Sequence, residues 1–166
     1  MLYARARGAK MKAHLFAASV AALVCLGGGV QAAEFHKDGM TAKEVQAWLS
    51  ESGYRAELAK DDEGDTYVKS ASDGVNFDAH LYDCKKERCA SMQFIAGFDM
   101  DAKLELAKIN EWNSDKRYVD GFIDEEGDPW FTYDLNLSPG GSREALDDDF
   151  AVWLSFLPDM KELAGW

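Results

Sequence analysis

Two cysteines, Cys84 and Cys89, are the side chains in this 166-residue chain that are best suited to covalent chemistry. In an oxidising compartment, two cysteines at this short spacing form a disulfide by default. A redox-active pair is the alternative, although redox motifs place only two residues between the cysteines. A metal site is the third interpretation, because His80 can share a face with Cys84, but no fourth ligand of the usual kind stands out. We therefore predict a structural disulfide, no bound metal and no cofactor.

Two acidic tracts, residues 61–65 and 124–128, raise the question of calcium binding, because each combines four acids with one glycine. An EF-hand loop requires acids at alternating positions, a glycine at the sixth position and a distant glutamate. Neither tract has this pattern, so we predict that both are solvated hairpin turns. Gly140 and Gly141 precede the last predicted helix, where backbone amides can bind an anion. A helix-capping loop explains these glycines equally well.

Side chains typical of catalysis are scarce outside the N-terminal region. Only His36 and His80 remain there, and neither G-x-S-x-G nor His-Glu-x-x-His occurs. No nucleophile has an evident base partner. The sequence therefore predicts no catalytic residue and a protein that is not an enzyme.

The N-terminal region has the three-part pattern of a bacterial secretory signal peptide. Four basic residues and no acid occur in the first twelve positions, and an apolar run follows over residues 15–30. Small residues then place the cleavage site between Ala32 and Ala33. A membrane anchor or a lipid on Cys25 are alternatives, but the run is short for a span of about 20 residues and the residue before the cysteine is not small. We predict a signal peptide over residues 1–32 and a periplasmic or secreted protein.

The chain is strongly acidic, with 30 acids against 18 basic residues and a net charge of −12. Loss of the predicted signal peptide removes four basic residues and no acid, so the mature chain is more acidic still. Such a surface repels phosphate backbones and anionic lipid headgroups. We therefore expect no nucleic-acid partner and no stable membrane insertion of the mature chain.

The segments on either side of the cysteines, residues 75–82 and 90–96, alternate between apolar and polar side chains. This period of two is typical of half-buried strands. Pairing the two cysteines also places Leu81 opposite Met92, and a slip of one residue would mix the two faces. We predict an antiparallel hairpin whose disulfide lies on its polar side.

The remaining periodicities predict an α+β domain over residues 40–166, preceded by a flexible segment over 33–39. The element order is α-ββββ-α-ββ-α, with an antiparallel sheet of about six strands, built from three hairpins, and helices packed on one face. The strand order stays open. The first expected helix runs from residue 42, after a capping box of Thr41 and Glu44, to about residue 52. The second runs from residue 99 or 100 to 113–115, and the third runs from residue 143, after the capping residue Ser142, to Pro158. The further expected strands are 54–60, 65–71, 118–123 and 130–137.

Three polar or aromatic side chains mark a candidate contact surface. The alternation that buries Phe131 sends Trp130 to the opposite, polar face of the sheet, and His80 and Tyr82 lie on the polar face of the cysteine hairpin. An exposed aromatic side chain can mark a contact site. The alternative interpretation is that the C-terminal tail, or a second copy of the chain, covers the Trp130 side chain.

Several short motifs resemble the YbjN family of sensory transduction regulators. Residues 109–113 (Ile-Asn-Glu-Trp-Asn) close the second predicted helix, Arg117 and Tyr118 open a strand, and residues 131–135 (Phe-Thr-Tyr-Asp-Leu) return after the acidic turn. Gly140-Gly141 before the last helix fits as well, and the similarity covers nearly all of residues 40–157. The resemblance implies a fold similar to type III secretion chaperones, which bind protein segments and often form dimers, and it supplies no catalytic residues.

These observations predict an exported, non-enzymatic YbjN-like module that binds or chaperones a protein or peptide partner in the cell envelope, with a homodimer as one allowed state. An edge strand that accepts a peptide is a second contact surface to consider. An envelope-stress or structural accessory factor is the first alternative function. An enzyme of unrecognised type is the second.

Overall fold

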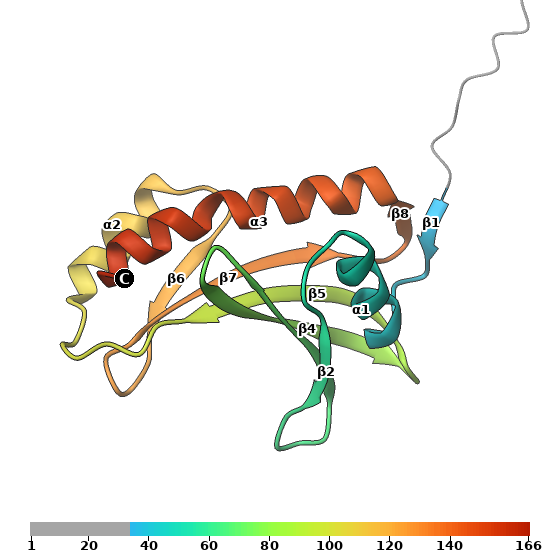
Figure 1. Ribbon diagram of the computed structural model, residues 1–166, viewed down its shortest axis with the longest axis horizontal. Coiled ribbons are helices and arrows are strands. Elements are labelled where there is room, and N and C mark those ends of the chain that lie inside the picture. Colours follow the sequence, from blue (N-terminus) through green and yellow to red (C-terminus); the bar gives the residue numbers. More distant parts are fainter. Residues whose placement is uncertain (1–33) are drawn as a thin grey trace, which may run out of the picture. The chain divides into compact units, whose positions relative to one another are not determined.

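The computed structural model describes residues 34–166 (Figure 1). The predicted signal peptide and its cleavage site, Ala32 and Ala33, lie outside the described residues. The strands are β1 (Glu34–Lys37), β2 (Glu57–Lys60), β3 (Thr66–Ser72), β4 (Val75–Lys85), β5 (Arg88–Gly97), β6 (Asp120–Ile123), β7 (Pro129–Asn136) and β8 (Gly140–Ser142). The helices are α1 (Ala42–Glu51), α2 (Leu106–Asp115) and α3 (Arg143–Ala164).

Strands β2 to β7 form one antiparallel sheet in the order β2-β3-β4-β5-β7-β6. The helices lie on one face of it, with α3 along the length of the sheet and α1 and α2 near its opposite ends (Figure 1). The predicted α+β class and the order α-ββββ-α-ββ-α are confirmed. In this order β7, and not β6, lies beside β5, so that β6 forms an edge of the sheet. The sequence left this strand order open.

The predicted register of the central hairpin is confirmed. Leu81 pairs with Met92 and Cys84 with Cys89 across β4 and β5. The apolar side chains of this register, such as Met92, are fully buried under the helices. Side-chain alternation therefore sets the register, since any slip by one residue would expose this row.

Helix α1 begins where its capping signal predicts. The Thr41 hydroxyl accepts a hydrogen bond from the Glu44 amide, and the Glu44 carboxylate accepts one from the Thr41 amide at 2.7 Å. These bonds satisfy two backbone donors that a helix start leaves without partners. Burial tends to raise the pKa of Glu44, but its bonds to Thr41 and its ion pair with Arg88 outweigh burial and lower it. The start of α1 is thus fixed next to the β4–β5 hairpin.

Helix α3 passes through Pro158 and ends at Ala164, so the prediction that proline ends the helix is wrong. A proline within a helix leaves one carbonyl without its usual partner. The buried stripe nevertheless continues beyond it with Met160 and Ala164, and Gly165 closes the helix in the left-handed conformation. Burial of this extra turn against the sheet outweighs the missing hydrogen bond.

Helix α2 starts at Leu106 rather than at residue 99 or 100. The preceding segment is attached to the β6–β7 turn instead. The Met100 amide donates to the Asp128 carboxylate at 3.0 Å, and the Leu104 amide donates to the Gly127 carbonyl at 3.0 Å. These tertiary bonds compete with helical bonds for the same amides, which delays the start of the helix.

A small second sheet joins β1 to β8, with His36 opposite Gly141. The sequence predicts a flexible segment over residues 33–39, whereas Glu34–Lys37 forms a strand there. The Asp38 amide adds a bond to the Pro139 carbonyl at 3.2 Å. The short polar segment has no periodicity of its own, and its order comes from pairing with a strand about a hundred residues further on.

An aromatic cluster fills the space between α1, α3 and the sheet. The Phe94 ring stacks on the Trp153 ring with centroids 5.7 Å apart, and Phe150 contacts Trp48 with centroids 5.3 Å apart. The Trp48 indole donates to Asp147 at 2.7 Å, so its buried polar atom has a partner. The sheet is therefore held rigidly from the helix side.

No helix among residues 34–166 is both long and apolar enough to cross a membrane.

Candidate functional site

We call the sheet face opposite the helices the open face. Alternation along β3 to β7 assigns to it the side chains that the core does not take, because Val68, Phe94 and Phe131 point toward the helices. No helix of the described residues covers it. Its side chains are Tyr67, Lys69, Asp78, His80, Tyr82, Ser91, Gln93, Ile95, Asp120, Phe122, Trp130, Thr132 and Asp134.

His80 is half-buried on the open face because it lies flat against a neighbouring ring. Its imidazole stacks on the Tyr67 ring at 4.5 Å between centroids and 7° between planes. Burial raises the pKa of the nearby Asp78 carboxyl, against the opposing effects of His80 and Lys69. The pair forms a flat aromatic patch beside a carboxylate that is partly removed from water.

Tyr82 is the most exposed of the three predicted contact residues, with 46% of its surface accessible. Its hydroxyl lies 3.4 Å from the Gln93 side-chain oxygen, and the Gln93 amide donates to Asp134 at 2.9 Å. Burial and the nearby acids Asp134 and Asp61 raise the pKa of Tyr82, so the phenol stays protonated and can donate.

Trp130 is half-buried by a second aromatic residue, Phe122, which was not among the predicted contact residues. Its indole lies nearly parallel to the Phe122 ring, with centroids 6.4 Å apart, and donates to Asp124 at 2.8 Å. Phe122 itself is 45% exposed on the edge strand β6. Gly97 lies beneath the indole, where a Cβ atom would come within 2.7 Å of the ring. The position of Phe122 could have been predicted: Gly121 pairs with the buried Phe131, so the next residue points to the open face.

The structure places His80, Tyr82 and Trp130 on the same face but not in one compact site. In the sheet register, His80 on β4 lies opposite Gln93 on β5, and Gln93 lies opposite Asp134 on β7. Trp130 lies four residues before Asp134 on the same strand. Strand spacing and rise then put His80 and Trp130 about 15 Å apart. The three residues belong to a broad surface with two aromatic patches.

Cys84 and Cys89 form the predicted disulfide. Its predicted position on the polar side is wrong, because both cysteines line a cavity on the helix side together with Leu81. Asp83 explains the difference: its φ of 55° is left-handed and interrupts the alternation of faces. Cys89 is only 5% exposed and pairs through its backbone with Met40 at 2.8 and 3.0 Å.

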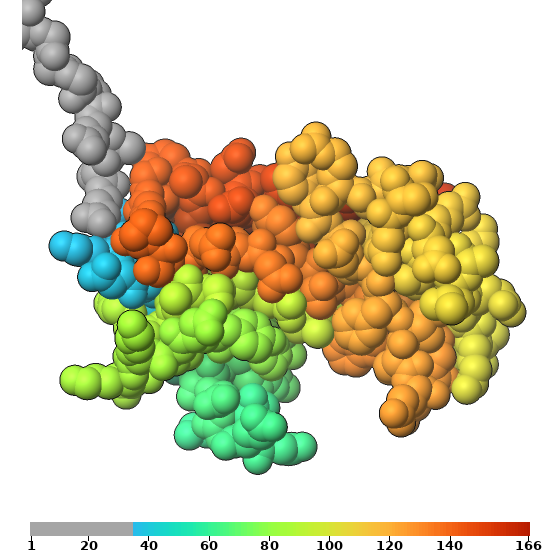
Figure 2. Space-filling view, turned by 180° about the vertical axis from the view of Figure 1, so that it is seen from behind, coloured from blue at the N-terminus to red at the C-terminus, as the bar shows by residue number. Residues whose placement is uncertain are grey.

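The acidic tracts are hairpin turns held by their first aspartate. The Asp61 carboxylate accepts from the Glu63 and Asp65 amides, at 3.0 and 2.8 Å. Asp124 does the same for three amides in the second turn, and these bonds and the Trp130 indole lower its pKa. The first turn protrudes from the body of the molecule (Figure 2). Among residues 34–166, no three His, Cys, Asp or Glu side chains converge as a metal ion requires.

Comparison with family models matches residues 41–160 to the YbjN family, described as "Putative bacterial sensory transduction regulator". The match covers most of the chain and the whole of the six-stranded sheet. The family is described as a regulator and not as an enzyme. No curated protein matches the chain.

Proposed function

Because the chain belongs to the YbjN family, we propose that it is a non-enzymatic regulatory or chaperone-like module that binds a protein segment in the cell envelope. The observation that supports this proposal best is the open face, which presents two aromatic patches on a sheet that the helices hold from behind. Large aromatic side chains on a rigid support are typical of protein contact sites.

The charges of the open face specify the chemistry of the partner. Asp78, Asp120 and Asp134 lie on it, and Lys69 is its basic residue. A segment with aromatic or apolar side chains and a basic side chain complements this arrangement, because opposite charges favour encounter and like charges exclude wrong partners. We therefore propose a basic, partly apolar protein segment as the ligand.

Two features support the proposed location in the envelope. The predicted signal peptide directs export, and a disulfide persists in an oxidising compartment but is rare in the cytoplasm. The acidic character of the chain favours a protein partner over nucleic acid or anionic lipid.

Site-specific photo-crosslinking in intact cells tests this proposal. A photoreactive residue at position 82 or 122 is expected to form covalent adducts with one and the same protein, because both positions are exposed on the open face. Leu106 is the matched control, since it is 63% exposed on α2, away from this face. Adducts with a second copy of the chain would identify the partner as a homodimer subunit.

The double variant Tyr82→Ala/Phe122→Ala provides the complementary measurement. We expect partner binding to weaken by about tenfold or more, as for two aromatic contact residues worth about 1 kcal/mol each. Leu106→Ala is expected to leave binding unchanged. Equal adducts at positions 82, 122 and 106, or unchanged binding by the double variant, would contradict the proposal.

A further inference from the structure

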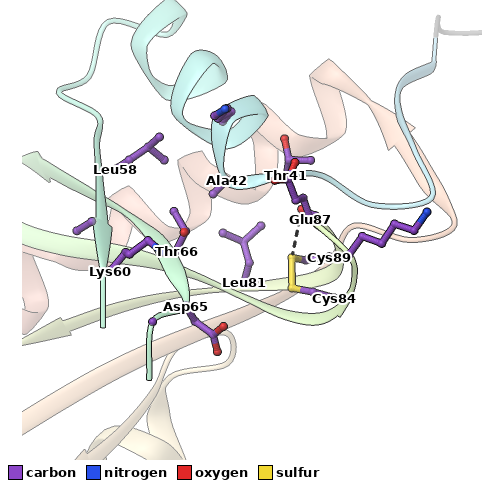
Figure 3. A pocket seen from close by; sticks show the side chains of 14 residues that line it. Thr41, Ala42, Leu58, Lys60, Asp65, Thr66, Leu81, Cys84, Glu87 and Cys89 are labelled. Atoms are coloured by element: carbon purple, nitrogen blue, oxygen red, sulfur yellow. Dashed lines mark hydrogen bonds between the residues drawn. A yellow bond between two sulfur atoms is a disulfide. The ribbon is translucent and has the colours of Figure 1, made fainter. Parts of the chain in front are cut away.

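A cavity of about 530 Å³ lies at one end of the helix-covered face of the sheet. It opens between the start of α1, the edge strand β2 with the turn that follows it, and the tip of the β4–β5 hairpin (Figure 3). Pockets that bury small ligands have volumes of roughly 300–1,000 Å³. The cavity is therefore large enough for a small molecule, and it is separate from the open face.

The floor of the cavity is apolar. Leu58 from β2, Ala42 from α1 and Leu81 from β4 approach it from three elements, and the disulfide lies beside Leu81 (Figure 3). None of these groups donates a strong hydrogen bond. A ligand portion with polar groups would lose hydrogen bonds with water here, whereas an aliphatic chain would lose none.

Three lysines, Lys43, Lys60 and Lys86, also line this cavity. All three are exposed, and they are among nine basic residues of the described residues 34–166 that form no ion pair. The two acids in the lining are Asp65 and Glu87. The lining thus has three ammonium groups against two carboxylates in a protein of net charge −12, and this small local excess favours an anionic ligand.

The wall formed by the hairpin tip is held in place before any ligand binds. The Arg88 guanidinium donates to the Gly39 carbonyl and to the Glu44 carboxylate, the latter at 2.7 Å. Cys89 is fixed by its disulfide and by its backbone pairing with Met40. A wall that is already ordered loses little conformational entropy on binding, which favours affinity.

We propose that this cavity binds a small amphiphilic monocarboxylate: an unbranched aliphatic chain that ends in a carboxylate. The aliphatic chain lies over Leu58, Leu81 and the disulfide. The carboxylate pairs with the Lys60 ammonium group at the rim of the cavity. This site is independent of the protein-binding function proposed above, because it lies on the opposite side of the sheet.

Isothermal titration of the purified chain with decanoate tests the proposal, with decan-1-ol as the uncharged comparison. Decanoate is expected to bind more tightly than the alcohol, by up to about fivefold, which is the upper end of the range for one partly screened ion pair. Raising the salt concentration should reduce this difference, since exposed charges are screened. Equal affinity for acid and alcohol would overturn the role of the lysines.

Reversing the charge of one lysine distinguishes an effect of the cavity on decanoate binding from an effect of the protein's net charge. Lys60→Glu is expected to weaken decanoate binding by about tenfold, because attraction becomes repulsion. Lys108→Glu on α2 is the matched control, since it changes the net charge by the same amount away from the cavity. Equal weakening by both variants would overturn the site.

Leu58→Asp tests the floor of the cavity. Leu58 is 38% exposed, so the change should leave the fold intact by circular dichroism, while decanoate binding falls by about tenfold or more. The variant Tyr82→Ala/Phe122→Ala is expected to bind decanoate normally, which separates this site from the open face. Unchanged binding by Leu58→Asp would overturn the proposal. The proposal would also be overturned if the native protein did not bind decanoate but bound a peptide that ends in leucine tightly.

Discussion

At the scale of single residues, Gly39 shows how little room the fold leaves at the junction of the N-terminal segment and the central hairpin. Its φ is +94°, and a Cβ atom would lie 2.0 Å from the Cys89 carbonyl oxygen. That oxygen accepts the Met40 amide, so neither backbone can move aside without breaking a bond. Gly53 has a similar φ of +90° but open space around it.

The two glycines therefore form a matched pair for mutation. Gly53→Ala is expected to lower the free energy of unfolding by about 1 kcal/mol, the cost of a left-handed alanine. Gly39→Ala adds a backbone clash and is expected to cost about 3 kcal/mol. Urea unfolding followed by circular dichroism measures both. Equal losses for the two variants would show that the approach of Gly39 to Cys89 is not tight.

Residue-scale contacts also explain why Trp130 and His80 differ from freely exposed aromatic side chains. Each stacks on a ring from an adjacent strand, Phe122 for Trp130 and Tyr67 for His80. Stacking restricts the rotamers of both rings before any partner arrives. The ordering cost of binding is correspondingly small, which suits a contact surface.

At the scale of elements, the β4–β5 hairpin connects three parts of the molecule. Its tip carries the disulfide, its Arg88 holds the start of α1 and the segment before it, and its strands form the centre of the sheet. The disulfide closes a short ring. Its effect on stability is therefore modest, and its main contribution is to hold the tip against Met40.

Removal of the disulfide tests this view. Cys84→Ala/Cys89→Ala is expected to lower the free energy of unfolding by about 2 kcal/mol, as chain-entropy arguments give for a short loop. Urea unfolding with and without reductant measures the change. Reductant should lower the stability of the native chain and leave that of the double variant unchanged. A destabilisation by reductant in the variant would assign the effect to something other than this bond.

At the scale of the whole molecule, the two faces of the sheet differ in what they expose. The helices bury the apolar side of every central strand, and the aromatic residues between them make that side rigid. The opposite side keeps its polar and aromatic side chains available. A regulatory or chaperone-like module of this kind would need only this stable support and an exposed surface.

Export of the whole chain is tested by mass spectrometry of protein recovered from the envelope and medium fractions. The mature chain is expected to begin at Ala33 and to contain no free thiol, since Cys25 leaves with the signal peptide and Cys84 and Cys89 are joined. The cytoplasmic fraction of the same cells is the control. An intact Met1 on a reduced chain in the cytoplasm would contradict export and the proposed place of action.

Periodicity in the sequence predicted the order of the main elements and the register of the central hairpin. The alternation in residues 75–82 and 90–96 was sufficient to predict the pairing of Leu81 with Met92 and of the two cysteines. The capping residues predicted the starts of α1 and α3, at Thr41 and Ser142. Such signals are local: they depend on neighbouring side chains and on which face is apolar, and the sequence contains both.

Only the tertiary structure decided the features that depend on residues distant in the sequence. Helix α3 continues through Pro158 because the sheet buries the turn beyond it, and β1 is ordered because β8 lies beside it. The disulfide faces the helices where the backbone of Cys89 pairs with that of Met40 and Asp83 has a left-handed backbone. The sequence predicted His80, Tyr82 and Trp130 as surface residues, but their division into two patches depends on the strand order. Free energies of packing between distant segments outweigh local preferences at these points, and no local pattern records them.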